Sequence, residues 1–362
     1  MAARYPLLLC PPALLLLSLL PGLAGCGPRL PAPLLQTPDP GAAVVWPSPP
    51  ETARLVWAGQ LRGAAISASE KSISSRISKL LFGSEPSHMV RPAAVARSVS
   101  GLLAVADPGI PTVHFFDLEA AVYRRLGAAA SDRLRSPVGV AVAGDGTTWV
   151  ADSVLGTVLV YDSLGRPAGQ LGEGVLERPA GLALSADEQT LYVVDTLACR
   201  VQFFDLDGRL AGGVGTRGTG PGQFNGPTHV ATTPGGGIAV SDSLNFRVQL
   251  FDGDGNWLGS FGGPGDGAGD FARPKGIGSD SSGRLYVADA GFDNVQVFDP
   301  DGTLLLSFGH AGTGTGQFNL PAGLFVDSGD RVWVSDPFNA RVQAFDPSQP
   351  PGTGNDPTGA RQ

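Results

Sequence analysis

The sequence is poor in charged residues and contains no basic run. Of its 362 residues 16% are charged, and 25 Lys and Arg stand against 33 Asp and Glu, so the formal net charge is −8. Because proteins hold nucleic-acid phosphates mainly with clustered Lys and Arg, no nucleic-acid partner is expected. Cysteine and histidine are also scarce, with three and four copies. The composition therefore favours neither a disulfide framework nor a metal-binding cluster, and no cofactor is expected.

The sequence also lacks an apolar run long and continuous enough for a secure membrane span. The one candidate, YPLLLCPPALLLLSLLPG, follows Arg4 and is interrupted by prolines. It closes with LAGC, which resembles the lipobox of bacterial lipoproteins. The resemblance implies a signal peptide at 1–25 and a lipid on Cys26. Residue 27 is Gly rather than Asp, which implies release to the outer membrane. An ordinary signal peptide with a chance cysteine is the alternative.

This reading leaves no two cysteines to pair. Cys10 would be removed with the signal peptide and Cys26 acylated, so Cys199 has no partner for an intrachain disulfide. The stretch 26–50 is rich in proline and is predicted to be an extended tether. The lipid is then the only expected contact with the membrane.

Glycine and proline are abundant, with 52 and 31 copies, which favours many short elements joined by turns. A predicted strand that ends in Asp recurs six times at steps of 43–47 residues. The six copies end at Asp107, Asp152, Asp195, Asp242, Asp289 and Asp336. A proline stands fifteen or sixteen residues before each Asp, namely Pro92, Pro137, Pro179, Pro227, Pro274 and Pro321. An aromatic-Asp pair follows each Asp ten residues later, as in Phe298-Asp299.

Each repeat parses into four short strands, which is typical of a propeller blade. Phrases such as GTGPGQFNGP, followed by a strand and then "D…RV", resemble NHL repeats over about residues 92–346. We therefore predict an all-β fold, a six-bladed NHL-like propeller over 51–348, with a disordered tail at 349–362. The last repeat lacks its outer strand. Because an unpaired blade edge would expose backbone donors and acceptors, residues 53–61 are predicted to close the ring.

One helix is expected outside the repeats. Ser67 and Glu70 fit a capping box, and apolar residues then recur at helical spacing, so 67–82 is predicted to be a short amphipathic helix. Its apolar side is expected to pack on the propeller. The alternative is a free helix that binds a partner.

Two glycine-rich motifs have a structural interpretation. GTGPGQFNGP and GTGTGQFNLP start 94 residues apart, which is two repeats of 47. GVGTRG also fits the nucleotide-binding pattern G-x-G-x-x-G, but a phosphate cradle needs a helix directly after the glycines. Here each loop leads through proline into a predicted strand, so the loops are interpreted as connections between blades. DGDGN at 252–256 has counterparts at the same hairpin in other repeats, DLDGR at 205–209 and DPDGT at 299–303, and is interpreted as a turn rather than a calcium loop.

The NHL resemblance leaves two classes of function open. Related propellers include metal-dependent lyases and lactonases, whose channel sites need several converging His or carboxylate side chains. Only His229 stands at the start of a predicted innermost strand, where other repeats have glycine. A single channel histidine is interpreted as a hydrogen-bonded structural residue, with ligand binding as the alternative. No catalytic residue and no metal ligand is assigned.

The resemblance favours a non-catalytic platform in the bacterial cell envelope that binds a protein or a small ligand. By family analogy, components of envelope electron-transfer systems are among the expected partners. In a four-stranded meander, the glycine loops share a face with the turns between second and third strands. Exposed aromatic residues beside arginine on that face are typical of binding hot spots. The alternative is that these arginines pair with the repeated Asp. The candidate binding residues are Arg200, Asn245, Phe246, Arg247, Phe338, Asn339, Arg341 and His229.

Overall fold

The structure is a computed structural model that describes residues 34–39, 43–63, 88–126 and 133–348. The predictions outside these residues are the signal peptide 1–25, acylated Cys26, part of the tether 26–50, the helix 67–82 and the tail 349–362. These stay predictions. In the part of the chain that the structure describes, no helix has both the length and the apolar character needed to cross a membrane.

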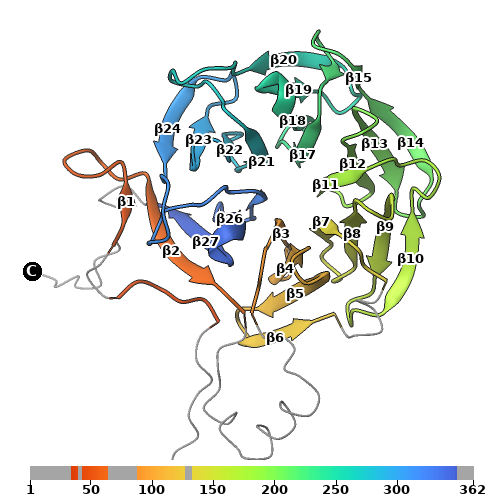
Figure 1. Cartoon of the computed structure of the whole chain (residues 1–362), viewed down its shortest axis with the longest axis horizontal. Helices are drawn as coiled ribbons and strands as arrows, with labels where there is room; N and C mark the ends of the chain where they lie inside the picture. Colours follow the sequence, from red (N-terminus) through yellow and green to blue (C-terminus); the bar gives the residue numbers. More distant parts are fainter. Residues whose placement is uncertain (1–33, 40–42, 64–87, 127–132, 349–362) are drawn as a thin grey trace, which may run out of the picture. The chain divides into compact units, whose positions relative to one another are not determined.

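Six antiparallel sheets surround a common axis, and each is a four-stranded meander or contains its equivalent (Figure 1). Blade 1 consists of β3 (Ala94–Arg97), β4 (Leu102–Asp107), β5 (Thr112–Asp117) and β6 (Val122–Arg125). Blade 2 consists of β7 (Pro137–Val142), β8 (Thr148–Asp152), β9 (Thr157–Tyr161) and β10 (Pro167–Leu171). Blade 3 consists of β11 (Pro179–Leu184), β12 (Thr190–Asp195), β13 (Arg200–Asp205) and β14 (Leu210–Val214).

The remaining blades follow the same order. Blade 4 consists of β17 (Pro227–Thr232), β18 (Ile238–Asp242), the short 3-10 helix η2 (Ser243–Asn245), β19 (Arg247–Phe251) and β20 (Trp257–Phe261). Blade 5 consists of β21 (Pro274–Ser279), β22 (Leu285–Asp289), β23 (Asn294–Phe298) and β24 (Leu304–Phe308). Blade 6 takes β25 (Leu324–Val326), β26 (Val332–Asp336), η3 (Pro337–Asn339) and β27 (Arg341–Pro347) from the C-terminal repeat. A parallel pair, β15 (Thr216–Arg217) and β16 (Gln223–Phe224), lies between blades 3 and 4. The prediction of a six-bladed all-β propeller is confirmed.

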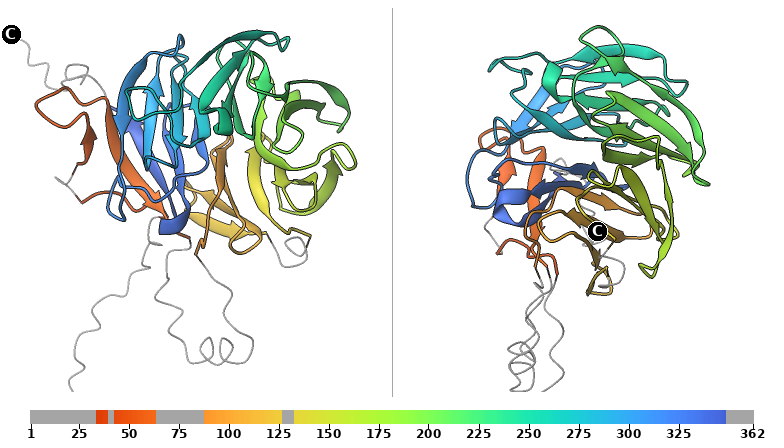
Figure 2. Two further views of the ribbon diagram at one scale, coloured as in Figure 1. Left: turned by 45° about the horizontal axis from the view of Figure 1, so that its top comes forward. Right: turned by 45° about the vertical axis from the view of Figure 1, so that its right-hand side comes forward.

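The N-terminal strand closes the ring, as predicted. Strand β2 (Leu55–Leu61) pairs with β27 from Leu55 opposite Pro347 to Leu61 opposite Val342. Figures 1 and 2 show β2 lying along the outside of the last blade. The indole Nε1 of Trp57 donates to Oε1 of Gln343 at 3.0 Å. A further strand that the sequence did not predict, β1 (Val45–Trp46), pairs with β2.

The turns follow from the Asp-x-x-Gly pattern of the repeats. Asp205, Asp252 and Asp299 each accept a hydrogen bond from the backbone amide four residues later, at 2.8 Å in all three blades. The glycine inside each turn has φ between +85° and +89°, a region that other residues rarely adopt. The interpretation of DGDGN as a hairpin turn is therefore confirmed.

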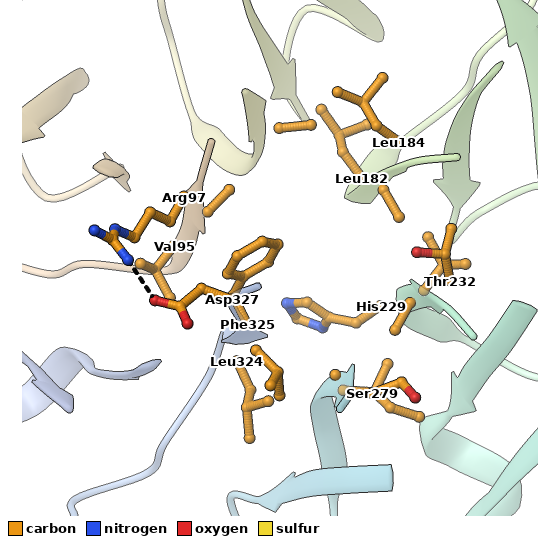
Figure 3. Close-up of a pocket in the computed structure, with 18 of the residues that line it drawn as sticks. Val95, Arg97, Leu182, Leu184, His229, Thr232, Ser279, Leu324, Phe325 and Asp327 are labelled. Atoms are coloured by element: carbon orange, nitrogen blue, oxygen red, sulfur yellow. Dashed lines mark hydrogen bonds and ion pairs between the residues drawn. The ribbon is translucent and has the colours of Figure 1, made fainter. Parts of the chain in front are cut away.

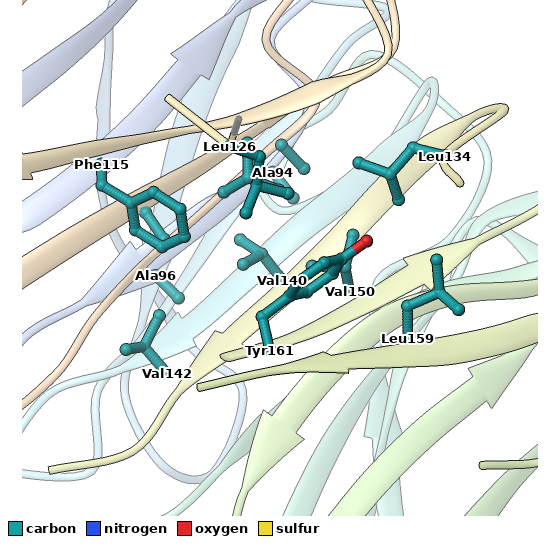
Figure 4. Close-up of a cluster of buried hydrophobic side chains, with 13 residues drawn as sticks. Ala94, Ala96, Phe115, Leu126, Leu134, Val140, Val142, Val150, Leu159 and Tyr161 are labelled. Carbon is teal, nitrogen blue, oxygen red and sulfur yellow. The ribbon is translucent and has the colours of Figure 1, made fainter. Parts of the chain in front are cut away.

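The hydrophobic core is divided among the interfaces between neighbouring blades. One cluster joins side chains of blades 1 and 2, with Phe115 on one side and Tyr161 on the other (Figure 4). Five more clusters of the same kind lie around the ring. Since each blade packs on two neighbours, the ring keeps its apolar surface buried only when it is closed.

Glycine lets the innermost strands approach one another at the axis. Each innermost strand contacts the next, and β25 contacts β3 to complete the circle. A Cβ on Gly181 would lie 2.6 Å from Cα of His229, and one on Gly139 would collide with the carbonyl oxygen of Ala180. Larger residues at these positions would push neighbouring blades apart.

Candidate functional site

The strand registers define two faces of the ring. In blade 3, Pro179 pairs with Asp195, which pairs with Arg200, so the start of the first strand and the turn between second and third strands lie together. Blades 4 and 5 have the same register. We call this side, with the glycine loops, the loop face. The opposite side, with the turns between first and second strands, is the turn face.

The repeated aspartates anchor the loop face and are buried. The carboxylate of Asp152 accepts hydrogen bonds from the backbone amides of Arg135 and Ser136, at 2.6 and 2.9 Å. Asp289 accepts those of Ala272 and Arg273, both at 2.8 Å. Each aspartate therefore links the loop before its own blade to the end of the second strand. Its carboxylate oxygens accept the hydrogen bonds that hold this loop in place.

Four of the predicted site residues continue this anchoring in blades 4 and 6. Nδ2 of Asn339 donates to Asp336 and to the carbonyl oxygen of Gly312, at 2.9 and 2.8 Å. Arg341 is 2% exposed, and its Nε donates to Asp336 at 2.8 Å while Nη2 donates to the carbonyl oxygens of Gly314 and Gln317.

Asn245 and Arg247 repeat this pattern around Asp242. Burial raises the pKa of Asp242, although the amide of Asn225 and the side chains of Asn245 and Arg247 donate to it. The alternative interpretation, in which the arginines pair with the repeated Asp, is therefore correct for Arg247 and Arg341. Arg200 is exposed on the loop face.

The two candidate phenylalanines differ in burial. Phe338 is 54% exposed, and the guanidinium carbon of Arg91 lies 4.9 Å from its ring centroid. Phe246 is half-buried and packs against the cluster between blades 4 and 5. It has φ of 55° and shares this left-handed slot with Cys199, Asp293 and Ala340. The expectation of an exposed aromatic is therefore right for Phe338 and wrong for Phe246.

Exposed apolar side chains gather on the loop face, a feature that the sequence analysis missed. They lie at the tips of the turns and in the loops that precede the first strands. The set comprises Val90, Val154, Leu155, Val175, Leu197, Leu244, Leu320 and Phe338. Five of the six blades or their connecting loops contribute, so the set surrounds the axis. The exposed leucines and valines of this set would be covered by a docked partner.

Basic side chains accompany them. Arg91, Arg135, Arg178 and Arg273 are exposed, and the backbone amide of each is held by its blade's repeated aspartate. Lys275 is half-buried, and burial, with the nearby charges of Arg273 and Arg91, lowers its pKa. None of the five forms a salt bridge within the described ranges.

A second candidate site is a cavity of about 380 Å³ on the axis, which we call the axial pocket (Figure 3). Its lining begins at the level of Gly139, Gly181 and His229 and continues to the turn face. Apolar side chains of the innermost strands form most of its wall, and Phe325 lies beside His229. Polar groups gather at its turn-face rim, where Arg97 pairs with Asp327 at 2.8 Å.

His229 lies at the inner end of the axial pocket, as its repeat position predicted. Neither ring nitrogen has a hydrogen-bond partner among the described residues, and both are buried. The interpretation of a hydrogen-bonded structural histidine is therefore wrong. Burial, with a smaller effect of the positive charge of Lys275, lowers the pKa of His229 to about 3, so the imidazole is neutral at physiological pH. In the ranges that the structure describes, no three His, Cys, Asp or Glu side chains are grouped to hold a metal ion.

Comparison with known proteins places the fold but not a family. No family model and no curated protein matches the chain. The chain is similar in structure to a streptogramin B lyase, with 12% identity, a TM-score of 0.53, and coverage of 72% of this chain and 94% of the lyase. A Bacteroides thetaiotaomicron protein of unknown function has 18% identity and a TM-score of 0.56 over 72% and 70% of the two chains. Kuenenia stuttgartiensis hydrazine synthase has 14% identity and a TM-score of 0.52 over 71% and 95%. The protein is thus a six-bladed β-propeller, similar in fold to proteins of the virginiamycin B lyase type.

Proposed function

We propose that the protein is a binding platform, held in the bacterial envelope by a lipid on Cys26, that docks a partner protein on its loop face. The observation that carries the proposal is the set of exposed apolar side chains, accompanied on the same face by basic residues that form no salt bridge with any described residue. In a chain with a net charge of −8, this concentration of unpaired positive charge on one face favours an acidic partner.

The chemistry of the face indicates the kind of partner. Apolar side chains such as Leu244 and Phe338 supply area that is buried on docking, and an exposed aromatic beside arginine is typical of an energetic anchor. The arginines around them attract carboxylates and orient the encounter. Acidic residues of the same loops, such as Glu173, Glu177 and Asp266, are also exposed and interrupt this positive charge. We infer a partner with an apolar protrusion among acidic residues.

No observation favours a metal-dependent enzyme over this platform. The lyases are similar to the chain in fold only, at 11–12% identity. At the rim of the axial pocket, Asp327 accepts hydrogen bonds from Arg97, Trp333 and backbone amides. Asp280 is held in the same way by Arg284 and Tyr286. These carboxylates shape the turns of the turn face.

The chain offers matched positions for a test. Leu244 on the loop face is 60% exposed, and Leu258 on the outer strand β20 is 63% exposed. Val154 and Val99, on the loop face and the turn face, are 70% and 74% exposed. A photo-reactive phenylalanine derivative is placed at each position in the lipidated protein, and bacterial cells are irradiated. The proposal expects one discrete adduct from positions 244 and 154 and little from 258 and 99.

The charge requirement is tested in the same cells. Arg91→Glu with Arg273→Glu should reduce the adduct from position 244 at least several-fold, because acidic partners are then repelled. Arg209→Glu on the turn face, where Arg209 is exposed and lies near Asp205 and Asp207, is the control for charge reversal elsewhere and should leave the yield unchanged. Equal adducts from both members of each matched pair, or an adduct that survives the double charge reversal, would overturn the proposal.

A further inference from the structure

The axial pocket is separate from the loop face. Its lining starts at the level of Gly139, Gly181 and His229, each of which is the second residue after the repeated proline of its blade. No described lining residue lies closer to the loop face than this level. At this level the backbones of adjacent innermost strands are in contact, and the ring of His229 extends from β17 toward the axis (Figure 3). A molecule would therefore enter from the turn face and meet His229 at the inner end.

The wall of the pocket is built for apolar contact. The innermost strands contribute Val95, Leu182, Leu324 and Phe325, and the ring of Phe325 lies next to that of His229. A cavity of about 380 Å³ is within the range of small-molecule sites, roughly 300–1,000 Å³. Such a volume accepts a bicyclic aromatic molecule but not a folded peptide.

His229 supplies an unsatisfied polar group inside this apolar wall. Neutral imidazole has one N–H donor and one nitrogen acceptor, and both nitrogens are buried without a partner in the described part of the chain. An unpaired buried polar group is costly, so a molecule that completes its hydrogen bonds gains binding energy. By contrast, the carboxylates at the rim already accept several hydrogen bonds each.

We propose that the axial pocket binds a neutral, largely apolar small molecule with one hydroxyl or carbonyl group, which enters from the turn face and hydrogen-bonds to the imidazole of His229. A charged head group is disfavoured, because the charged side chains among the described lining residues lie at the turn-face rim and none lies at the inner end beside His229. A hydroxyl group matches the site especially well, since it both donates and accepts.

The test uses two probes of nearly equal shape, 1-naphthol and 1-methylnaphthalene. Binding to the purified protein is measured by titration of the ¹⁵N-labelled imidazole signals and by calorimetry. The proposal expects 1-naphthol to bind about fivefold more tightly than 1-methylnaphthalene, the gain from one hydrogen bond of about 1 kcal/mol. It also expects the His229 signal to move while that of exposed His310 does not.

Two variants make the result decisive. His229→Leu should bind both probes equally, because the hydrogen bond is lost while the apolar wall is kept. Leu182→Trp should fill the pocket from its wall and weaken both probes at least tenfold, which covers the case in which the His229 variant does not fold. Equal affinities for the two probes in the wild-type protein, or no binding of either at their solubility limits, would overturn the proposal. Binding that leaves the His229 signal unmoved would overturn it as well.

Discussion

Acidification should destabilise the propeller through His229. Its pKa is lowered to about 3 in the folded chain, against 6.5 for an ordinary histidine in the unfolded chain. Because the folded pKa is the lower one, the contribution to stability is fully present above pH 6.5 and is lost as the pH falls from there toward 3. The unfolded state binds the proton in this window and the folded state does not.

The size of the effect follows from the two pKa values. At pH 7 protonation of the unfolded state lowers the free energy of unfolding by almost nothing, whereas at pH 5 it lowers it by about 2 kcal/mol. Aspartates with lowered pKa values, such as Asp162 and Asp252, also contribute stability that is lost as the pH falls, but they do so equally in wild type and in a His229 variant. Asp242, whose pKa is raised, has the opposite sign and stabilises the fold as the pH falls. The difference in the pH dependence of stability between wild type and a His229 variant therefore gives the contribution of the histidine alone.

Urea unfolding at pH 7 and pH 5 measures this difference. The free energy of unfolding of wild type should fall by about 2 kcal/mol more than that of His229→Gln, whose side chain does not titrate. His310→Gln, the same replacement at an exposed histidine, is measured alongside as the matched control. If wild type and His229→Gln lose the same stability between the two pH values, the reasoning about the buried, unpaired imidazole is refuted.

Three further predictions concern closure, anchoring and localisation. Deletion of 53–61 should lower the melting temperature sharply or cause aggregation, while deletion of 351–362 should leave melting unchanged; calorimetry compares them. Arg341→Ala should cost roughly 3 kcal/mol in urea unfolding, because it removes the cationic partner of the buried Asp336, whereas Arg200→Ala should cost less than about 0.5 kcal/mol. Cys26→Ser should move the protein from the membrane to the soluble fraction, and membrane retention of this variant would contradict the lipid anchor.

The fold could be predicted because a propeller repeats its local rules. Each blade has a proline at or just before the start of its first strand and a buried Asp at the end of its second. Blades 2 to 5 also have an Asp-x-x-Gly turn, and these residues recur at nearly constant spacing. The missing outer strand of blade 6 required a partner, and β2 supplies it. Strand β1 was not predictable in this way, because two residues in a proline-rich stretch carry no periodic pattern.

The site was less predictable because burial is a tertiary property. Phe246 and Phe338 look alike in sequence, but only Phe246 occupies the left-handed slot, from which it packs between blades. Arg247 and Arg341 look like binding residues until their loop partners are seen. A usable signal did exist for the basic residues of the loop face. In four repeats an arginine stands one or two residues before the repeated proline, at Arg91, Arg135, Arg178 and Arg273.

Radical footprinting of intact envelopes tests the docking of a partner on the loop face most directly. Oxidation rates of exposed side chains are measured in the lipidated protein in its membrane and again after purification in detergent. The proposed function predicts that Leu244 and Val154 are oxidised several-fold more slowly in the envelope, while Leu258 and Val99, with matching exposure, are unchanged. Equal rates at all four positions, or protection of Val99 instead of Val154, would contradict it.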